Sequence, residues 1–227
     1  MSVRGATSRC LPAPSGARLT FRVTLAIRQG GAQAPGGAMG RSQHRESAQV
    51  DIVGARLSYG QRRVFDGLTC HFPAGQISCV LGASGGGKST LLRTLCTLTR
   101  PDYGDVLIGD EEVTRMSERE LRSVRDRIGM MFQGGALLDS MTVFDNVALP
   151  LREHTRLSAS EIEERVHEQF EAVGLKGVSD LLPGQLSGGM VKRAALARAL
   201  INEPDILLCD EPFSGLRPGR GPHDRGA

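Results

Sequence analysis

The chain has 227 residues, of which 40% are hydrophobic and 23% charged; this suffices for one sizeable globular domain with tails. The formal net charge is only +3, which is too small to indicate a nucleic-acid partner, and we expect none. No run of about 18 apolar residues occurs, so the sequence predicts no membrane-spanning helix.

Residues 1–48 differ in composition from the rest of the chain. They are rich in Arg and Gly and contain a single acidic residue, Glu46. We interpret them as a disordered N-terminal extension. Alternation of apolar residues over 19–27 would also suit a short strand. A transit peptide, an ordered extension and an upstream stretch wrongly read as coding remain alternatives.

Residues 49–216 alternate between short strands and helices. The expected elements, in chain order, are strands over 50–59, 63–72 and 76–82, a helix over 88–98, a hairpin over 101–114, a helix over 117–127, a strand over 128–133, helices over 158–174 and 188–201, and a strand over 206–209. Ser158 and Glu161 mark one helix start as a capping box. Strands alternating with helices predict an α/β fold with a parallel sheet.

The strongest motif is GASGGGKS at 82–89, which fits the phosphate-loop pattern GxxxxGK[ST]. Small residues let backbone N–H groups converge on phosphate oxygens, and the following helix adds its positive dipole. Lys88 would reach the β- and γ-phosphates, and Ser89 would bind Mg²⁺. The expected nucleotide-binding residues are Gly82, Ala83, Ser84, Gly85, Gly86, Gly87, Lys88, Ser89 and Thr90. An ordinary glycine turn is the alternative.

A second motif is ILLCDE at 206–211, an apolar strand that ends in two carboxylates. Carboxylates beside a buried strand are costly unless they serve a cation or a proton transfer. We expect Asp210 to hold Mg²⁺ through water and Glu211 to accept a proton from an attacking water. A strand that simply ends in an acidic turn is the alternative.

A third motif is LSGGM at 186–190, at the start of a predicted helix. Ser187, Gly188 and Gly189 would form a second anion site there. Two phosphate sites in one chain suggest that two chains share each nucleotide. An ordinary helix cap is the alternative.

Together, the phosphate loop, Gln133, LSGG and the Asp-Glu strand resemble the ABC ATPase family over about residues 50–216. The resemblance implies a P-loop NTPase fold with a parallel-sheet core, an N-terminal antiparallel β subdomain and a helical subdomain. It also implies ATP and Mg²⁺ as cofactors, and ATP hydrolysis by a homodimer. Tyr59 would stack on adenine, and Ser187, Gly188 and Gly189 would contact the γ-phosphate held by the second subunit.

The resemblance also implies partners and a location. Gln133 would touch Mg²⁺ and the attacking water, and would couple to an integral membrane permease subunit. The stretches FQGGALLDSMTVFDNVALPLREHTRLS and LSGGMVKRAALARAL resemble the ATPase of Mce- or Mla-type lipid transporters. We therefore expect a cytoplasmic subunit, peripheral on the inner face of the cell membrane, that drives phospholipid transport across the bacterial envelope. Partner subunits would handle the lipid.

The family pattern stops after Leu216, where Arg217 stands in place of the Asp of SGLDP. We expect 49–216 to be an incomplete ATP-binding domain, truncated after the Asp-Glu (Walker B) strand, and 217–227 to be a disordered tail. A truncated, inactive remnant and a non-transport ABC ATPase are therefore the alternative functions.

Overall fold

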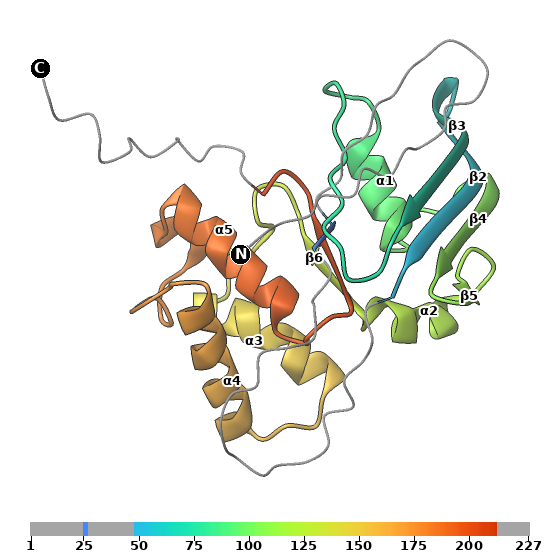
Figure 1. Ribbon diagram of the computed structural model, residues 1–227. Helices are drawn as coiled ribbons and strands as arrows, with labels where there is room; N and C mark the ends of the chain where they lie inside the picture. The colour runs from blue at the N-terminus through green and yellow to red at the C-terminus, as the bar shows by residue number, and fades with distance from the viewer. Residues whose placement is uncertain (1–24, 27–47, 213–227) are drawn as a thin grey trace, which may run out of the picture. The chain divides into compact units, whose positions relative to one another are not determined.

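The structure is a computed structural model that describes residues 25–26 and 48–212 (Figure 1). These residues form two compact units. The first contains the described residues up to Met130 together with Asn202–Asp210, and the second contains Met131–Ile201 with Glu211 and Pro212. Most of the predicted extension over 1–48 and the predicted tail over 217–227 lie outside the described residues.

An antiparallel sheet of four strands, in the order β3-β2-β4-β5, dominates the first unit (Figure 1). This sheet confirms the strands predicted over 50–59 and 63–72 and the hairpin predicted over 101–114. Helices α1 and α2 complete this part of the unit. The bounds are β2 (Val50–Tyr59), β3 (Arg62–Phe72), α1 (Lys88–Leu95), β4 (Tyr103–Ile108), β5 (Glu111–Glu112) and α2 (Glu118–Arg125). Their fully buried side chains include Ile52, Leu91, Leu95, Ile108 and Leu121.

Strands β2 and β4 approach each other very closely at one point. Gly104 of β4 has a φ of 85°. A Cβ atom built there would lie 2.5 Å from the carbonyl oxygen of Val53 and 2.7 Å from Cα of Ala55. The register of the β2–β4 pair shifts between Val53 and Arg56. Both the backbone conformation and the lack of space therefore require glycine at position 104.

A second sheet has the order β1-β7-β6. Its strands are β1 (Leu25–Ala26), β7 (Ile206–Cys209) and β6 (Ile128–Met131). Strand β1 pairs antiparallel with β7, with Leu25 opposite Leu208. The strands predicted over 128–133 and 206–209 are confirmed.

The strand predicted over 76–82 is wrong. Ser78 makes an isolated bridge, and residues 79–83 have no regular secondary structure. A strand needs a neighbour for its backbone N–H and C=O groups. Among the described residues, the second sheet pairs β7 with β1 and β6, and no strand runs beside 79–83.

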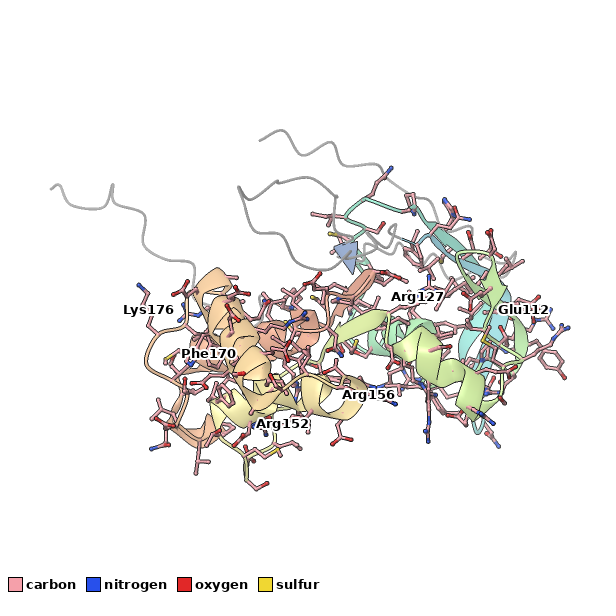
Figure 2. The ribbon with its side chains drawn as sticks, turned by 90° about the horizontal axis from the view of Figure 1, so that it is seen from below. Glu112, Arg127, Arg152, Arg156, Phe170 and Lys176 are labelled. Carbon is pink, nitrogen blue, oxygen red and sulfur yellow. The ribbon has the colours of Figure 1, made fainter. Side chains whose placement is uncertain are left out.

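Arg127, which is labelled in Figure 2, connects three segments of the first unit through hydrogen bonds. Its Nε donates a hydrogen bond to the Asp205 carboxylate at 2.8 Å, and its terminal Nη1 donates to the Glu111 carboxylate at 2.9 Å. Its hydrogen bond to Asp205 is the main cause that raises the pKa of the Arg127 guanidinium. The Asp205 side chain is 4% exposed, so this ion pair is a buried structural tie between the residues that precede β6 and β7.

The second unit is helical. It contains α3 (Val143–His154), α4 (Ala159–Ala172), the short 3-10 helix η1 (Pro183–Gln185) and α5 (Gly188–Leu200). The helices are held together by a core of Val147, Leu151, Val166, Phe170, Ala194 and Ala197. Phe170, on α4, is labelled in Figure 2. The helices predicted over 158–174 and 188–201 are confirmed, and the Ser158–Glu161 capping box forms. None of the helices in the described part of the chain combines the length and apolar character needed to cross a bilayer.

Candidate functional site

The phosphate loop occupies the turn that leads into α1. Gly87 has a φ of 88° and is the N-cap of α1, which begins at Lys88. The first N–H groups of a helix have no acceptor within the helix, so those of α1 are available to an anion. Lys88 Nζ donates to the carbonyl oxygens of Gly82 and Ala83 at 3.0 and 2.9 Å. These two hydrogen bonds hold the ammonium against the backbone of the phosphate loop. An ammonium has three N–H donors, so one remains for a ligand.

Strand β3 supports the phosphate loop from outside. The guanidinium of Arg62 donates to the Gly85 carbonyl at 2.8 Å. A Cβ atom at Gly87 would lie 2.8 Å from Cγ1 of Val64 and 3.3 Å from the ring of Phe65. The loop is therefore pressed against β3, and only glycine fits at position 87. Arg62 had no predicted role, because its partner is a backbone carbonyl that any residue could supply.

Tyr59 and Asp210 also belong to the first unit. Tyr59 ends β2, is 51% exposed and pairs with Arg62 across the hairpin. The same Arg62 donates to the phosphate loop, so the end of β2 that carries Tyr59 pairs with the residue that holds that loop. Asp210 follows β7 and is 8% exposed. Adenine stacking by Tyr59 and Mg²⁺ binding by Asp210 stay predictions.

In the second unit, the structure brings Gln133 and Glu211 together, although 78 positions separate them. The Gln133 amide Nε2 donates to Glu211 Oε2 at 2.9 Å. Glu211 has a φ of 48°, in the left-handed region that non-glycine residues seldom adopt. The two side chains predicted to act on the attacking water are thus in direct contact.

Helix α5 carries the LSGGM motif at its start. Ser187 is the N-cap, and its hydroxyl accepts a hydrogen bond from the Met190 N–H at 3.3 Å. Ser187 and Gly188 are exposed, so the helix N-terminus can be approached from solvent. One turn further on, Lys192 donates to the carbonyl oxygens of Glu211 and Pro212 at 3.4 and 3.3 Å. The same helix therefore carries the second predicted anion site and contacts the backbone of Glu211.

Two further polar residues, both missed by the sequence analysis, hold the segment that follows Gln133. Asn146 is 0% exposed. Its side chain accepts from the Leu138 N–H at 2.7 Å and donates to the carbonyls of Leu138, Met141 and Thr142. Arg198 donates to the carbonyls of Gly135 and Ala136. The one sequence signal that could have indicated a role for Arg198 is its position as a charged residue in the alanine-rich helical stretch AALARAL.

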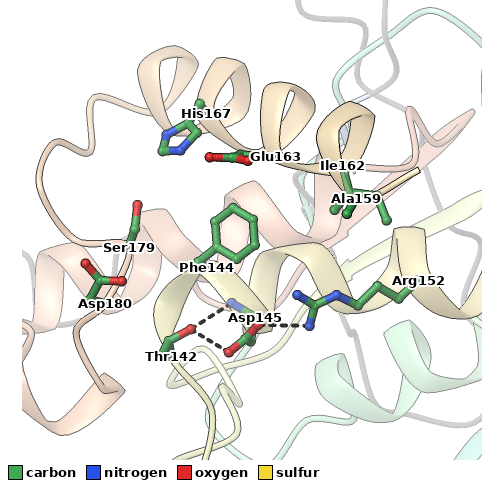
Figure 3. A pocket seen from close by; sticks show the side chains of 10 residues that line it. All are labelled: Thr142, Phe144, Asp145, Arg152, Ala159, Ile162, Glu163, His167, Ser179 and Asp180. Carbon is green, nitrogen blue, oxygen red and sulfur yellow. Dashed lines mark hydrogen bonds and ion pairs between the residues drawn. The ribbon is translucent and has the colours of Figure 1, made fainter. Parts of the chain in front are cut away.

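A pocket of about 840 Å³ lies on the second unit between α3 and α4 (Figure 3). Phe144 projects into it, and the guanidinium carbon of Arg152 lies 5.9 Å from the centre of that ring. Arg152 also pairs with Asp145 at 2.8 Å. A hydrogen bond from Thr142, and then one from Arg152, lower the pKa of Asp145. The wall nearest α4 is formed by Ala159, Ile162, Glu163 and His167.

The phosphate loop, the capped LSGGM helix and the Gln133–Glu211 pair define a nucleotide-binding cassette. The sequence profile of the ABC transporter family matches residues 65–214, and the chain belongs to this family.

Two curated relatives cover most of the chain. The probable ribonucleotide transport ATP-binding protein mkl of Mycobacterium leprae (strain TN) is 47% identical over 171 residues, covering 75% of this chain and 49% of the relative. The intermembrane phospholipid transport system ATP-binding protein MlaF of Escherichia coli (strain K12) is 47% identical over 169 residues, covering 74% of this chain and 63% of MlaF. The chain thus spans about half of the length of mkl and less than two thirds of the length of MlaF.

A solved structure shares the fold. The dimeric, post-hydrolysis state of the ATP-binding cassette MJ0796, bound to ADP and Pi, is similar with a TM-score of 0.65 and 29% identity. The similarity covers 74% of this chain and 76% of MJ0796. These matches confirm the predicted family and the predicted α/β fold of the ABC ATPase type.

Proposed function

We propose that the chain is the ATP-binding and ATP-hydrolysing subunit of an ABC transporter that moves lipid. The contact between Gln133 and Glu211 carries this proposal, because it assembles a water-activating pair in a chain that also has a phosphate loop. Its two groups have complementary roles: an amide can orient a water, and a carboxylate can take its proton.

In this proposal the loop 82–89 and the first turn of α1 bind the triphosphate. Lys88 keeps the loop closed through its hydrogen bonds to the carbonyls of Gly82 and Ala83. Its ammonium group also donates a hydrogen bond to the β- and γ-phosphates. Tyr59, an exposed residue at the end of β2, stacks on adenine. Each of these residues acts by binding and orienting the nucleotide.

The oxygen donors of the chain suit Mg²⁺, which prefers carboxylate, hydroxyl and water ligands. Asp210 is a nearly buried carboxylate at the end of β7, and a carboxylate in that environment is stabilised by a cation. Ser89 would supply a hydroxyl, Asp210 a carboxylate contact through water, and Gln133 an amide oxygen. Bound Mg²⁺ would neutralise charge on the phosphates.

The partners follow from the same arrangement. Ser187, Gly188 and Gly189 lie at an exposed helix start, where they would contact the γ-phosphate bound by a second copy of the chain. A homodimer would therefore enclose the nucleotides, and the similar cassette MJ0796 is dimeric. A permease subunit in the membrane would bind the segment 134–154 and place the chain at the cytoplasmic face.

The cargo is proposed from the relative MlaF, whose name refers to intermembrane phospholipid transport. Another relative with the same identity, mkl, is named for ribonucleotide transport. A transport assay in proteoliposomes with the cognate permease therefore needs both cargoes. ATP-dependent movement of labelled phospholipid supports the proposal, and movement of ribonucleotide alone contradicts the lipid assignment.

The first prediction tests nucleotide binding. Replacing Lys88 with Ala removes the charge inside the loop, and we expect ATP affinity measured by calorimetry to fall by at least about 100-fold, or about 2.7 kcal/mol. Lys176→Ala is the matched control, since Lys176 is exposed and lies outside every motif. Equal affinity for ATP in the Lys88 and Lys176 variants would refute the phosphate-loop assignment.

A further inference from the structure

The loop that follows Gln133 has an unusual backbone. Three consecutive residues, Gly134, Gly135 and Ala136, have φ values of 81°, 88° and 47°. The left-handed region is unfavourable for a non-glycine residue such as Ala136. Such a loop keeps its shape only if its surroundings hold it. The residues that hold it therefore also determine where Gln133 lies.

Helix α5 provides the surface against which this loop packs. A Cβ atom at Gly135 would lie 2.9 Å from Cγ1 of Val191 and 3.4 Å from Cβ of Ala195. Gly135 therefore lies directly on the helix, with no room for a side chain between them. The loop backbone and α5 are in van der Waals contact.

Arg198, on the same helix, holds the loop by its carbonyl groups. One terminal nitrogen donates to Ala136 O and the other to Gly135 O, both at 2.9 Å. Burial lowers the pKa of the Arg198 guanidinium, yet arginine keeps its charge in proteins. Its hydrogen bonds are therefore charge-assisted and stronger than bonds between neutral groups.

The planar fork of Arg198 matches two carbonyls on consecutive residues, a geometry that the single ammonium of lysine does not reproduce. The helix that carries this fork begins at the LSGGM motif. A helix of this length moves as a rigid element, so a displacement of its first turn also displaces Arg198. That displacement reaches the loop through two short hydrogen bonds.

We propose that Arg198 is a positioning residue that fixes the Gln133 loop to helix α5, so that Gln133 follows the movement of the LSGGM motif. This inference rests on the proposed ATPase function. Arg198 touches neither nucleotide nor water in this scheme. It acts on hydrolysis through the placement of Gln133, and so couples the second anion site to the water-orienting amide.

Arg193 offers a matched control on the same helix. It also donates to one backbone carbonyl, that of Gly174, at 2.9 Å, but Gly174 lies in the turn after α4. Removing either arginine deletes one positive charge and a side-chain to backbone contact of α5. Only the Arg198 variant loosens the Gln133 loop.

The test compares Arg198→Ala, Arg198→Lys and Arg193→Ala in the full chain. For Arg198→Ala we expect kcat of ATP hydrolysis to fall by roughly 10- to 100-fold, as for a misplaced group, with KM for ATP within about two-fold. Arg198→Lys is expected to recover part of kcat, and Arg193→Ala to keep it. Equal kcat in the two alanine variants, or a rise in KM alone, overturns the proposal.

Hydrogen–deuterium exchange provides a readout independent of catalysis. Amides of residues 134–140 should exchange faster in Arg198→Ala than in Arg193→Ala, with those of α3 and α4 unchanged. A parent chain without ATPase activity contradicts the proposed function, whereas unchanged exchange over 134–140 contradicts the role of Arg198. If Arg198→Ala does not fold, the same exchange and kcat comparison is made with Arg198→Lys against Arg193→Lys.

Discussion

At the scale of single residues, long basic side chains hold the backbone of the site. The bonds join Arg62 to the phosphate loop, Lys88 to that same loop, Lys192 to the segment of Glu211, and Arg198 to the loop after Gln133. In each case the acceptor is a carbonyl oxygen. A carbonyl leaves no trace in residue type, which explains why the motifs predicted the residues expected to meet the nucleotide but not the residues that support them.

The second prediction concerns Glu211. Replacing it with Gln keeps an oxygen that can accept from Gln133 but removes the basic carboxylate. We expect the rate of ATP hydrolysis to fall by roughly two to four orders of magnitude, while ATP binding persists and a dimer accumulates in gel filtration with ATP. Glu171→Gln, an exposed change on α4, serves as the control. Turnover near the parental rate would assign the proton acceptor to another group.

At the scale of elements, α3 shows what sequence patterns missed. Its N-cap, Thr142, has the ordinary geometry, and its hydroxyl accepts from the Asp145 N–H at 3.0 Å. However, Pro150 lies inside the helix, and a proline in that position argues against a helix. The buried stripe of Val143, Val147 and Leu151 outweighs the one missing hydrogen bond. Burial of apolar side chains thus overrode local propensity.

The third prediction tests the Asn146 clamp on α3. Asn146→Ala leaves a buried N–H and three carbonyls without this partner, and each unsatisfied buried group costs about 1–3 kcal/mol. We expect urea denaturation to show a loss of about 2–4 kcal/mol in the free energy of unfolding. Thr142→Ala removes a helix cap and the hydroxyl's hydrogen bond to the Asp145 carboxylate, and should cost about 1 kcal/mol. A cost for Asn146→Ala no larger than that of the cap would disprove the clamp.

The predicted elements succeeded where local signals and packing agree. The capping box at Ser158 gave the start of α4, and the strands predicted over 50–59 and 63–72 match β2 and β3 to within one residue. The strand predicted over 76–82 failed for a non-local reason, because a strand depends on a neighbour that its own residues do not encode. For the site, the motifs predicted Gln133 and Glu211 as members, and only the structure gave their contact.

At the scale of the whole molecule, the candidate groups are divided between two units. The phosphate loop, Tyr59 and Asp210 belong to the first, and Gln133, the LSGGM motif and Glu211 to the second. The chain passes from one unit to the other at residues 130–131, 201–202 and 210–211. The residues proposed to hold the chain's own nucleotide and those proposed to act on the attacking water thus belong to different units of one chain.

The fourth prediction concerns the membrane partner. Asp139 and Ser140 are exposed and lie in the segment proposed to face a permease. A photo-crosslinker at Ser140, in cells of the source organism, should attach to an integral membrane protein identified by mass spectrometry. The control position is Arg119, an exposed residue of α2 in the first unit. Crosslinks from Ser140 to ribosomal proteins or DNA alone would favour a non-transport ABC ATPase.

The close approach of β2 and β4 at Gly104 leaves position 104 unable to accept other residues. Alanine there would bring a methyl group into the backbone of β2, and no rotamer change relieves a clash made by Cβ itself. In a saturation mutagenesis experiment, position 104 would therefore be as intolerant as the phosphate loop, although it has no chemical group to contribute. Intolerance alone does not separate a residue that meets the nucleotide from one that keeps two strands together.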